Sequence, residues 1–198
     1  MARRKQLRQW ARLRVLCCSG LSLLSVVPDA FAVVREIVPN AAAALFLTSP
    51  EGVPHAFLHE DSPESVQSLF LGEPQLFVGP HEFNVFRLVG APGAISCPTL
   101  APPGEAYFRS NTYQLLVRGS GHHHTLDARL EVDGRRSGLV SLFREPGRGF
   151  DEHDIARVAL HFEHALKAAN PSDPADELAG PEAMLVCTPQ LAASGVKV

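Results

Sequence analysis

The sequence predicts an α+β fold in which an antiparallel sheet is flanked by N- and C-terminal helices. A hairpin pattern over residues 124–143, a helical pattern directly after it, and a second hairpin pattern over residues 41–59 all point to this class. The chain has 198 residues, 45% of them hydrophobic and 20% charged, which suits one soluble domain with extensions. A net charge of -3 gives no general reason to expect a nucleic-acid partner.

Residues 1–20 predict an amphipathic helix. Its apolar face carries Trp10, Leu13, Cys17 and Leu21, and basic residues crowd the remainder. An export signal is the alternative, because an apolar run follows the basic start and residues 30–32 form a small-x-small site. Since positive charge continues into the helix, we expect an intact N terminus and a cytoplasmic protein. No apolar run reaches the length of a membrane span, and four scattered cysteines favour reduced thiols.

The next segment predicts a helix and then two strands. Pro28 suits the first turn of the helix, whose apolar side continues to Val38. Strands over 41–48 and 53–59 are expected on either side of a turn at 49–52.

Residues 60–110 contain so many glycines and prolines that long regular elements are excluded. Short helices are expected near 63–70 and 83–89, with ordered loops or a lid between and after them. A further short helix is expected over 111–118.

The hairpin over 124–143 has the clearest periodicity in the chain. Residues 124–132 alternate apolar and polar side chains, which predicts one buried face and a solvent-facing side that includes Arg129. Asp133-Gly134 favours a tight turn, and the nearly all-apolar run over 138–143 indicates a central strand covered on both faces. Asp151 and Asp154 then suit the start of a closing helix to Ala169.

The run from Val132 to Leu142, followed by Phe150 and Asp154, resembles the closing half of a GAF domain, although Ser137 stands where that family usually has an apolar residue. The stretches 107–113 and 122–144 are similar to the sensor portion of bacterial LuxR-type transcriptional regulators. The resemblance implies a GAF-like sensory domain over 21–169, used in signal transduction and transcriptional regulation through an unidentified small molecule.

Residues 170–181 predict a linker, and 182–198 resemble the incomplete start of a PAS-like segment. In LuxR-type regulators a DNA-binding helix-turn-helix follows the sensor. We therefore expect a regulator truncated before that part, with no direct nucleic-acid binding from this chain.

The predicted ligand pocket combines the start of the hairpin with aromatic residues of the presumed lid. Its members are His122, His124, Tyr107, Phe108, Tyr113 and Phe86. A metal site on His122 and His124 is the weaker alternative, because its third ligand would have to come from Cys97, His55 or His59 without a ligand pattern. We expect no metal and leave the cofactor unknown.

No catalytic motif is visible, so we expect a protein that is not an enzyme. No serine lies in a nucleophile elbow, and Gly119-Ser120-Gly121 lacks the lysine of a phosphate-binding loop. Apolar surplus on the two terminal helices predicts a homodimer. A structural dimerisation module without a ligand remains the competing function.

Overall fold

The computed structural model describes residues 2–17, 19, 21, 23–49, 51, 53–90, 95–96, 105–132 and 135–158. Within these ranges, residues 2–39 with 131–132, 135 and 156–158 form one compact unit, and residues 40–130 with 136–155 form a second. The predicted linker at 170–181, the tail at 182–198 and the hairpin turn at Asp133-Gly134 lie outside the described residues. The predicted domain boundaries therefore stay predictions.

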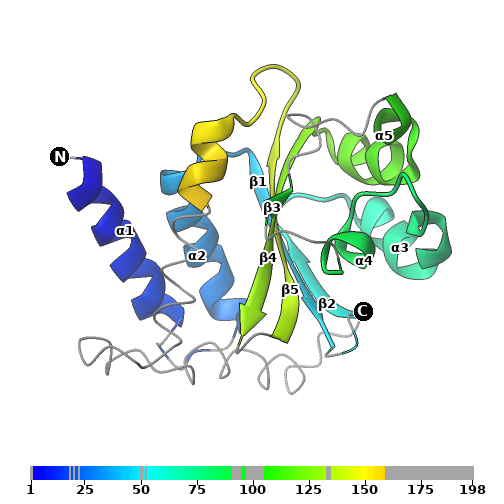
Figure 1. The fold of residues 1–198 in the computed structure, drawn as a ribbon. Helices are drawn as coiled ribbons and strands as arrows, with labels where there is room; N and C mark the ends of the chain where they lie inside the picture. The colour runs from blue at the N-terminus through cyan, green and yellow to red at the C-terminus, as the bar shows by residue number, and fades with distance from the viewer. Residues whose placement is uncertain are drawn as a thin grey trace. The chain divides into compact units, whose positions relative to one another are not determined.

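The first unit is built on two helices that lie side by side, α1 (Ala2–Cys17) and α2 (Leu23–Ile37) (Figure 1). Arg12 of α1 forms an exposed ion pair of 2.8 Å with Glu36 of α2. Pro28 lies inside α2 rather than in its first turn, which corrects the predicted start of that helix. Val26 and Val27 are buried just before it, and this apolar burial favours the earlier start.

The second unit contains a five-stranded sheet in the order β2-β1-β5-β4-β3. Its strands are β1 (Ala42–Thr48), β2 (Pro54–His59), β3 (Ile95–Ser96), β4 (His124–Val132) and β5 (Arg135–Arg144). β1 pairs antiparallel with both β2 and β5, and β3 pairs antiparallel with β4. Both predicted hairpins and the α+β class are confirmed.

β5 is central in the sheet, as its apolar run predicted. Gly138 pairs with Leu47 of β1, and a Cβ atom at this position would lie 2.1 Å from the carbonyl oxygen of Phe46. Because that oxygen belongs to the backbone, a side chain here would force the two strands apart. The close approach of β1 and β5 therefore requires glycine.

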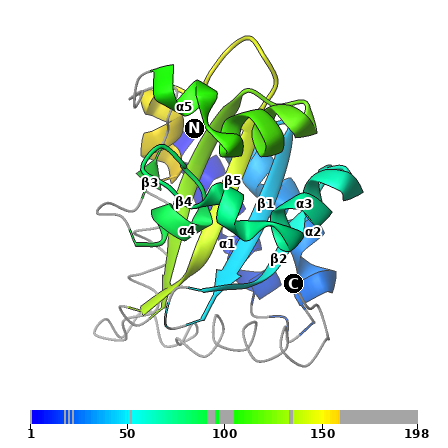
Figure 2. The same ribbon diagram turned by 90° about the vertical axis from the view of Figure 1, so that its right-hand side faces the viewer.

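Short helices gather on one side of the sheet in Figure 1 and lie in front of its strands in Figure 2. They are α3 (Glu64–Gly72), η1 (Pro74–Phe77), α4 (Val85–Leu88), α5 (Glu105–Arg109), η2 (Thr112–Val117) and η3 (Arg118–Ser120). The helix expected over 111–118 is a π-helix followed by a 3-10 turn. Wide turns of this kind recur at functional sites.

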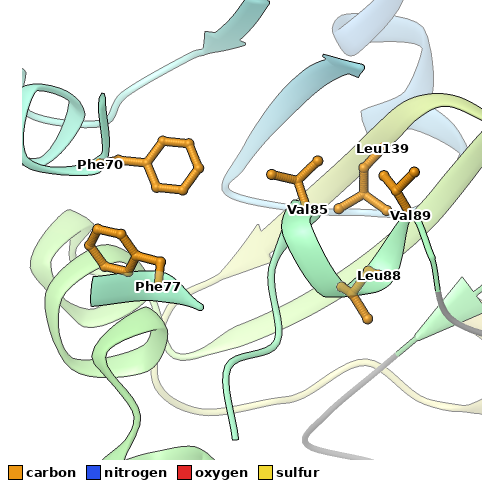
Figure 3. Close-up of a cluster of buried hydrophobic side chains, with 6 residues drawn as sticks. All are labelled: Phe70, Phe77, Val85, Leu88, Val89 and Leu139. Carbon is orange, nitrogen blue, oxygen red and sulfur yellow. The ribbon is translucent and has the colours of Figure 1, made fainter. Parts of the chain in front are cut away.

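A hydrophobic cluster joins these helices to β5 (Figure 3). Phe70 of α3 and Phe77 of η1 have ring centroids 5.5 Å apart. Val85 and Val89, from α4 and the residue after it, lie beside Leu139 of β5. All of these side chains are at most 6% exposed, so the helical layer is anchored on the sheet by packing.

The closing helix begins as the sequence predicted, and residues 152–158 are helical. The Asp151 carboxylate accepts a hydrogen bond from the backbone of Asp154 at 3.0 Å, and Asp154 accepts one from the backbone of Asp151 at 3.3 Å. This reciprocal pair of hydrogen bonds resembles a capping box and satisfies backbone N–H groups at the start of the helix.

The solvent-facing side predicted for β4 is wrong. Thr125 and Asp127 are only 5% exposed, although they alternate with the buried Leu126 and Ala128. Arg129, on the same side, is half-buried. The helical layer covers this polar face of the strand, so residues 125–128 of β4 are buried on both faces.

Candidate functional site

A cavity of about 60 Å³ lies between the sheet and the short helices of the second unit. Thr125, Asp127 and Ser141 form its polar floor on β4 and β5. Its aromatic wall consists of the rings of Phe46, Phe57, Phe70, Phe83 and Phe143. Its roof is made by Val85 of α4 with Thr112, Leu116 and Val117 of η2. This volume holds several waters or the slender part of a ligand.

Asp127 is the central group of the polar floor. Ser141 Oγ donates a hydrogen bond of 2.6 Å to Asp127 Oδ1. Asp127 Oδ2 is buried and has no hydrogen-bond partner among the described residues. A buried carboxylate oxygen without a donor is costly, so this side chain is poised to accept one.

The position of Asp127 changes its acidity. Burial raises the pKa of the Asp127 carboxyl to about 6, and the hydroxyls of Ser141 and Thr125 act in the opposite direction. Thr125 is close enough to have this effect, although no hydrogen bond of acceptable geometry joins its hydroxyl to Asp127. At neutral pH the cavity therefore holds a mostly ionised carboxylate.

His59 of β2 is the other titratable side chain that lines the described cavity. Its Nδ1 accepts hydrogen bonds from the backbone N–H groups of Asp61 and Ser62, at 3.3 and 3.1 Å. Burial lowers the pKa of His59 to about 4, outweighing the opposite effect of Asp61. His59 is consequently neutral at pH 7, with its proton on Nε2.

The aromatic wall is held by mutual ring contacts. Phe46 and Phe57 stack with centroids 5.5 Å apart, and Phe70 meets both edge-on at 6.0 Å. Such arrangements fix the rings in place. The wall is consequently a preformed apolar surface beside the polar floor.

The roof is tied down by a second carboxylate, that of Glu82. It accepts hydrogen bonds from the backbone N–H groups of Asn111 and Thr112, at 3.0 and 2.7 Å, and from the Thr112 hydroxyl. These donors lie at the start of η2, where a helix leaves N–H groups unpaired. Glu82 therefore fixes the end of η2 that contributes Thr112 to the roof.

Asn84 extends this network to the neighbouring turns. Its amide donates to the carbonyl oxygen of Phe77 at 2.9 Å and to Thr112 Oγ1 at 2.7 Å, while its Oδ1 accepts from the backbone of Phe86. Asn84 is thus the N-cap of α4 and a link between η1 and η2.

None of the six predicted pocket residues lines this cavity, and whether any of them meets a ligand stays a prediction. Tyr107, Phe108 and Tyr113 instead form a ring cluster with His123, in which the Tyr113 hydroxyl lies 2.5 Å from His123 Nδ1. Phe86 contacts Phe70, which belongs to the aromatic wall.

The two predicted pocket histidines also have structural contacts. His122 is buried and its Nε2 lies 3.1 Å from Asp61 Oδ1. His124 Nε2 lies 3.2 Å from the carbonyl oxygen of Gly147, and burial lowers its pKa. In the part of the chain that the structure describes, no three His, Cys, Asp or Glu residues are placed to hold a metal ion.

The polar floor and the aromatic wall were missed in the sequence. The nearly all-apolar β5 run indicated that the centre of the sheet is covered on both faces, and the same covering extends over the polar side of β4. That run was the signal from which a buried Asp127 could have been inferred. The aromatic wall combines residues 46, 57, 70, 83 and 143, and only folding brings these together.

The arrangement of sheet, helical layer and cavity can be compared with that of known proteins. No model of a known protein family matches the sequence, and neither does a curated protein. The N-acylhomoserine lactone-dependent LuxR-family transcription factor CepR2 of Burkholderia cenocepacia has a TM-score of 0.59 at 12% identity, covering 95% of this chain and 98% of that chain. The VqsR ligand-binding domain of Pseudomonas aeruginosa has a TM-score of 0.53 at 16% identity, covering 84% and 93%.

These similarities concern the fold. The chain is similar in fold to sensing portions of LuxR-type regulators, which confirms that resemblance, whereas the GAF-like description is not confirmed. No helix in the described ranges is long and apolar enough to cross a membrane.

Proposed function

We propose that this chain is the small-molecule-sensing module of a LuxR-type transcriptional regulator, and that the cavity is its ligand site. The unsatisfied Asp127 Oδ2 inside the cavity carries the proposal, because it offers a ligand a buried acceptor. The fold shared with two regulator domains supports it. A ligand that fills the cavity would contact the sheet and the helical layer together, which could report binding to the rest of a regulator.

Binding fits the site better than catalysis. Ser141 donates its hydroxyl proton toward Asp127, and the histidine of the cavity, His59, uses its Nδ1 to accept backbone N–H groups. An activated serine nucleophile needs a base that a third group orients, and Asp127, which accepts the Ser141 proton, has no such group on its Oδ2 among the described residues. We therefore propose a sensor without enzymatic activity.

Filling the cavity tests the proposal. Leu116 lines the roof, whereas its neighbour Leu115 is 37% exposed and does not. We expect native mass spectrometry of protein purified from cell extract to show a bound small molecule in the wild type and in Leu115→Trp. Leu116→Trp should lose that molecule while keeping its fold by circular dichroism. Equal retention in both variants would contradict the site, and no retained molecule in any sample would favour a structural dimerisation module.

The proposal extends to a cytoplasmic homodimer that assembles through its terminal helices. Leu7 and Val15 of α1 are 54% and 70% exposed, which supplies apolar surface for a second copy. Light scattering of Leu7→Glu/Val15→Glu should give half the mass of the wild type. A monomeric wild type at high micromolar concentration would contradict the homodimer.

A further inference from the structure

The cavity carries an uncompensated negative charge. Of the described side chains that line it, only Asp127 and His59 are titratable, and none is Lys or Arg. Ser141 satisfies one carboxylate oxygen of Asp127, and the other has no partner in the described part of the chain. The charge of Asp127 has therefore been taken out of water without a cation beside it.

The charged groups on neighbouring elements do not change this balance. His59 of β2 is neutral, because its Nδ1 accepts two backbone hydrogen bonds. Arg129 lies two residues along β4 but is not among the cavity-lining residues. Arg87 of α4 lies over the Phe83 ring and donates to the Pro80 carbonyl oxygen. Neither arginine is among the described residues that line the cavity, although Arg87 lies against Phe83, one ring of the aromatic wall.

The aromatic wall suits a cation in two ways. A phenylalanine ring attracts a positive group over its face, and this attraction grows when water is excluded. Five such rings line the cavity, and one of them, Phe83, already has Arg87 over it. They also exclude water from Asp127, which strengthens a charged hydrogen bond formed there. An anion would be repelled by Asp127 and would find no positive group on the lining.

We infer that the ligand of this cavity is a small organic cation, a protonated amine or amidine with an apolar body, whose N–H donates to Asp127 Oδ2 while the body lies against the aromatic wall. The inference rests on the proposed ligand site and names the chemical class that it accepts.

Three probes of matched shape test the inference by titration calorimetry at pH 7.5. Butylamine is a cation, 1-butanol is neutral, and pentanoate is an anion, and all three are slender enough for the cavity. We expect the amine to bind at least about tenfold more tightly than the alcohol, because it pairs with a desolvated carboxylate, and the anion to bind most weakly. Equal or tighter binding of the alcohol or the anion would overturn the inference, as would no binding of the amine.

Asp127→Asn should reduce amine binding to within about threefold of alcohol binding, because it removes the charge and keeps the shape. Glu105→Gln is the matched control, since its carboxylate is 87% exposed and lies outside the cavity. It should leave all three affinities unchanged. Unchanged amine affinity in Asp127→Asn would overturn the inference even if the cavity binds all probes.

A measurement on the wild type covers the case in which Asp127→Asn does not fold. Because protonation removes the charge of Asp127, amine affinity should fall about tenfold between pH 7.5 and pH 5, while alcohol affinity stays constant. A flat amine profile would contradict the inference. If the alcohol binds, and Leu116→Trp abolishes its binding, the cavity remains a ligand site and only the cation is wrong.

Discussion

Two buried carboxylates, Glu82 beside the roof and Asp127 in the polar floor, differ in how many hydrogen bonds they accept. Glu82 beside the roof is 9% exposed and accepts three hydrogen bonds, two of them from backbone N–H groups. Asp127 in the polar floor is 5% exposed and accepts one hydrogen bond, from Ser141. Both side chains are desolvated, so the difference lies in what replaces the lost water.

The comparison separates a structural role from a binding role. A carboxylate whose oxygens are satisfied by donors of its own fold stabilises that fold, and here it fixes the start of η2. A carboxylate left with a bare oxygen destabilises the empty protein in its charged form and has interaction energy to offer a ligand. The same residue chemistry thus serves the fold at the roof and, in our proposal, recognition at the polar floor.

The largest effect is expected when the satisfied carboxylate is removed. Glu82→Ala leaves three donors without their acceptor, so we expect it to lower the free energy of unfolding by about 3 kcal/mol or more. Urea unfolding followed by circular dichroism measures this. Glu105→Ala, on the exposed surface of α5, should cost about 0.5 kcal/mol or less. A loss of less than 1 kcal/mol in Glu82→Ala would remove the contrast between the two carboxylates.

A smaller effect on the free energy of unfolding is expected from a change in pH, and it acts through the carboxylate of Asp127. Because the pKa of Asp127 is raised to about 6, the folded state binds a proton more readily than the unfolded state. The stability that this proton binding gives the folded state is fully present below the unfolded pKa near 3.8 and is lost as pH rises through 6. The pKa of His59 is lowered to about 4, so its contribution is present above 6.5 and lost as pH falls toward 4. The two contributions offset each other in overlapping windows.

Asp127→Asn should remove the contribution of Asp127 to the pH dependence of stability and leave that of His59. At pH 7 the variant should lie within about 1 kcal/mol of the wild type, because it loses a hydrogen bond to charge but also a buried charge. Between pH 7 and pH 5 it should lose about 1 kcal/mol more stability than the wild type, measured by urea unfolding at both values. Parallel pH profiles for the two proteins would show that Asp127 does not titrate in this range.

Much of the fold could be predicted from local sequence. The strand over β4, the central place of β5 and the helix start at residues 151 and 154 each follow from neighbouring residues alone, and each matched the structure. The solvent-facing side expected for β4 did not. The start of α2 was wrong because buried valines outweighed the usual place of a proline. A cost in one backbone hydrogen bond is smaller than the gain from burying two side chains.

The site was decided by tertiary structure. The sequence by itself placed polar residues on one side of β4, but a period of two says only that the faces differ and not which face meets water. Once the helical layer covers that polar side, Asp127 and Ser141 become the floor of a cavity. Phenylalanines from β1, β2, α3 and β5 then become part of its aromatic wall. The residues of the site are separated by up to about a hundred positions in the chain, so their meeting depends on long-range packing that no local pattern encodes.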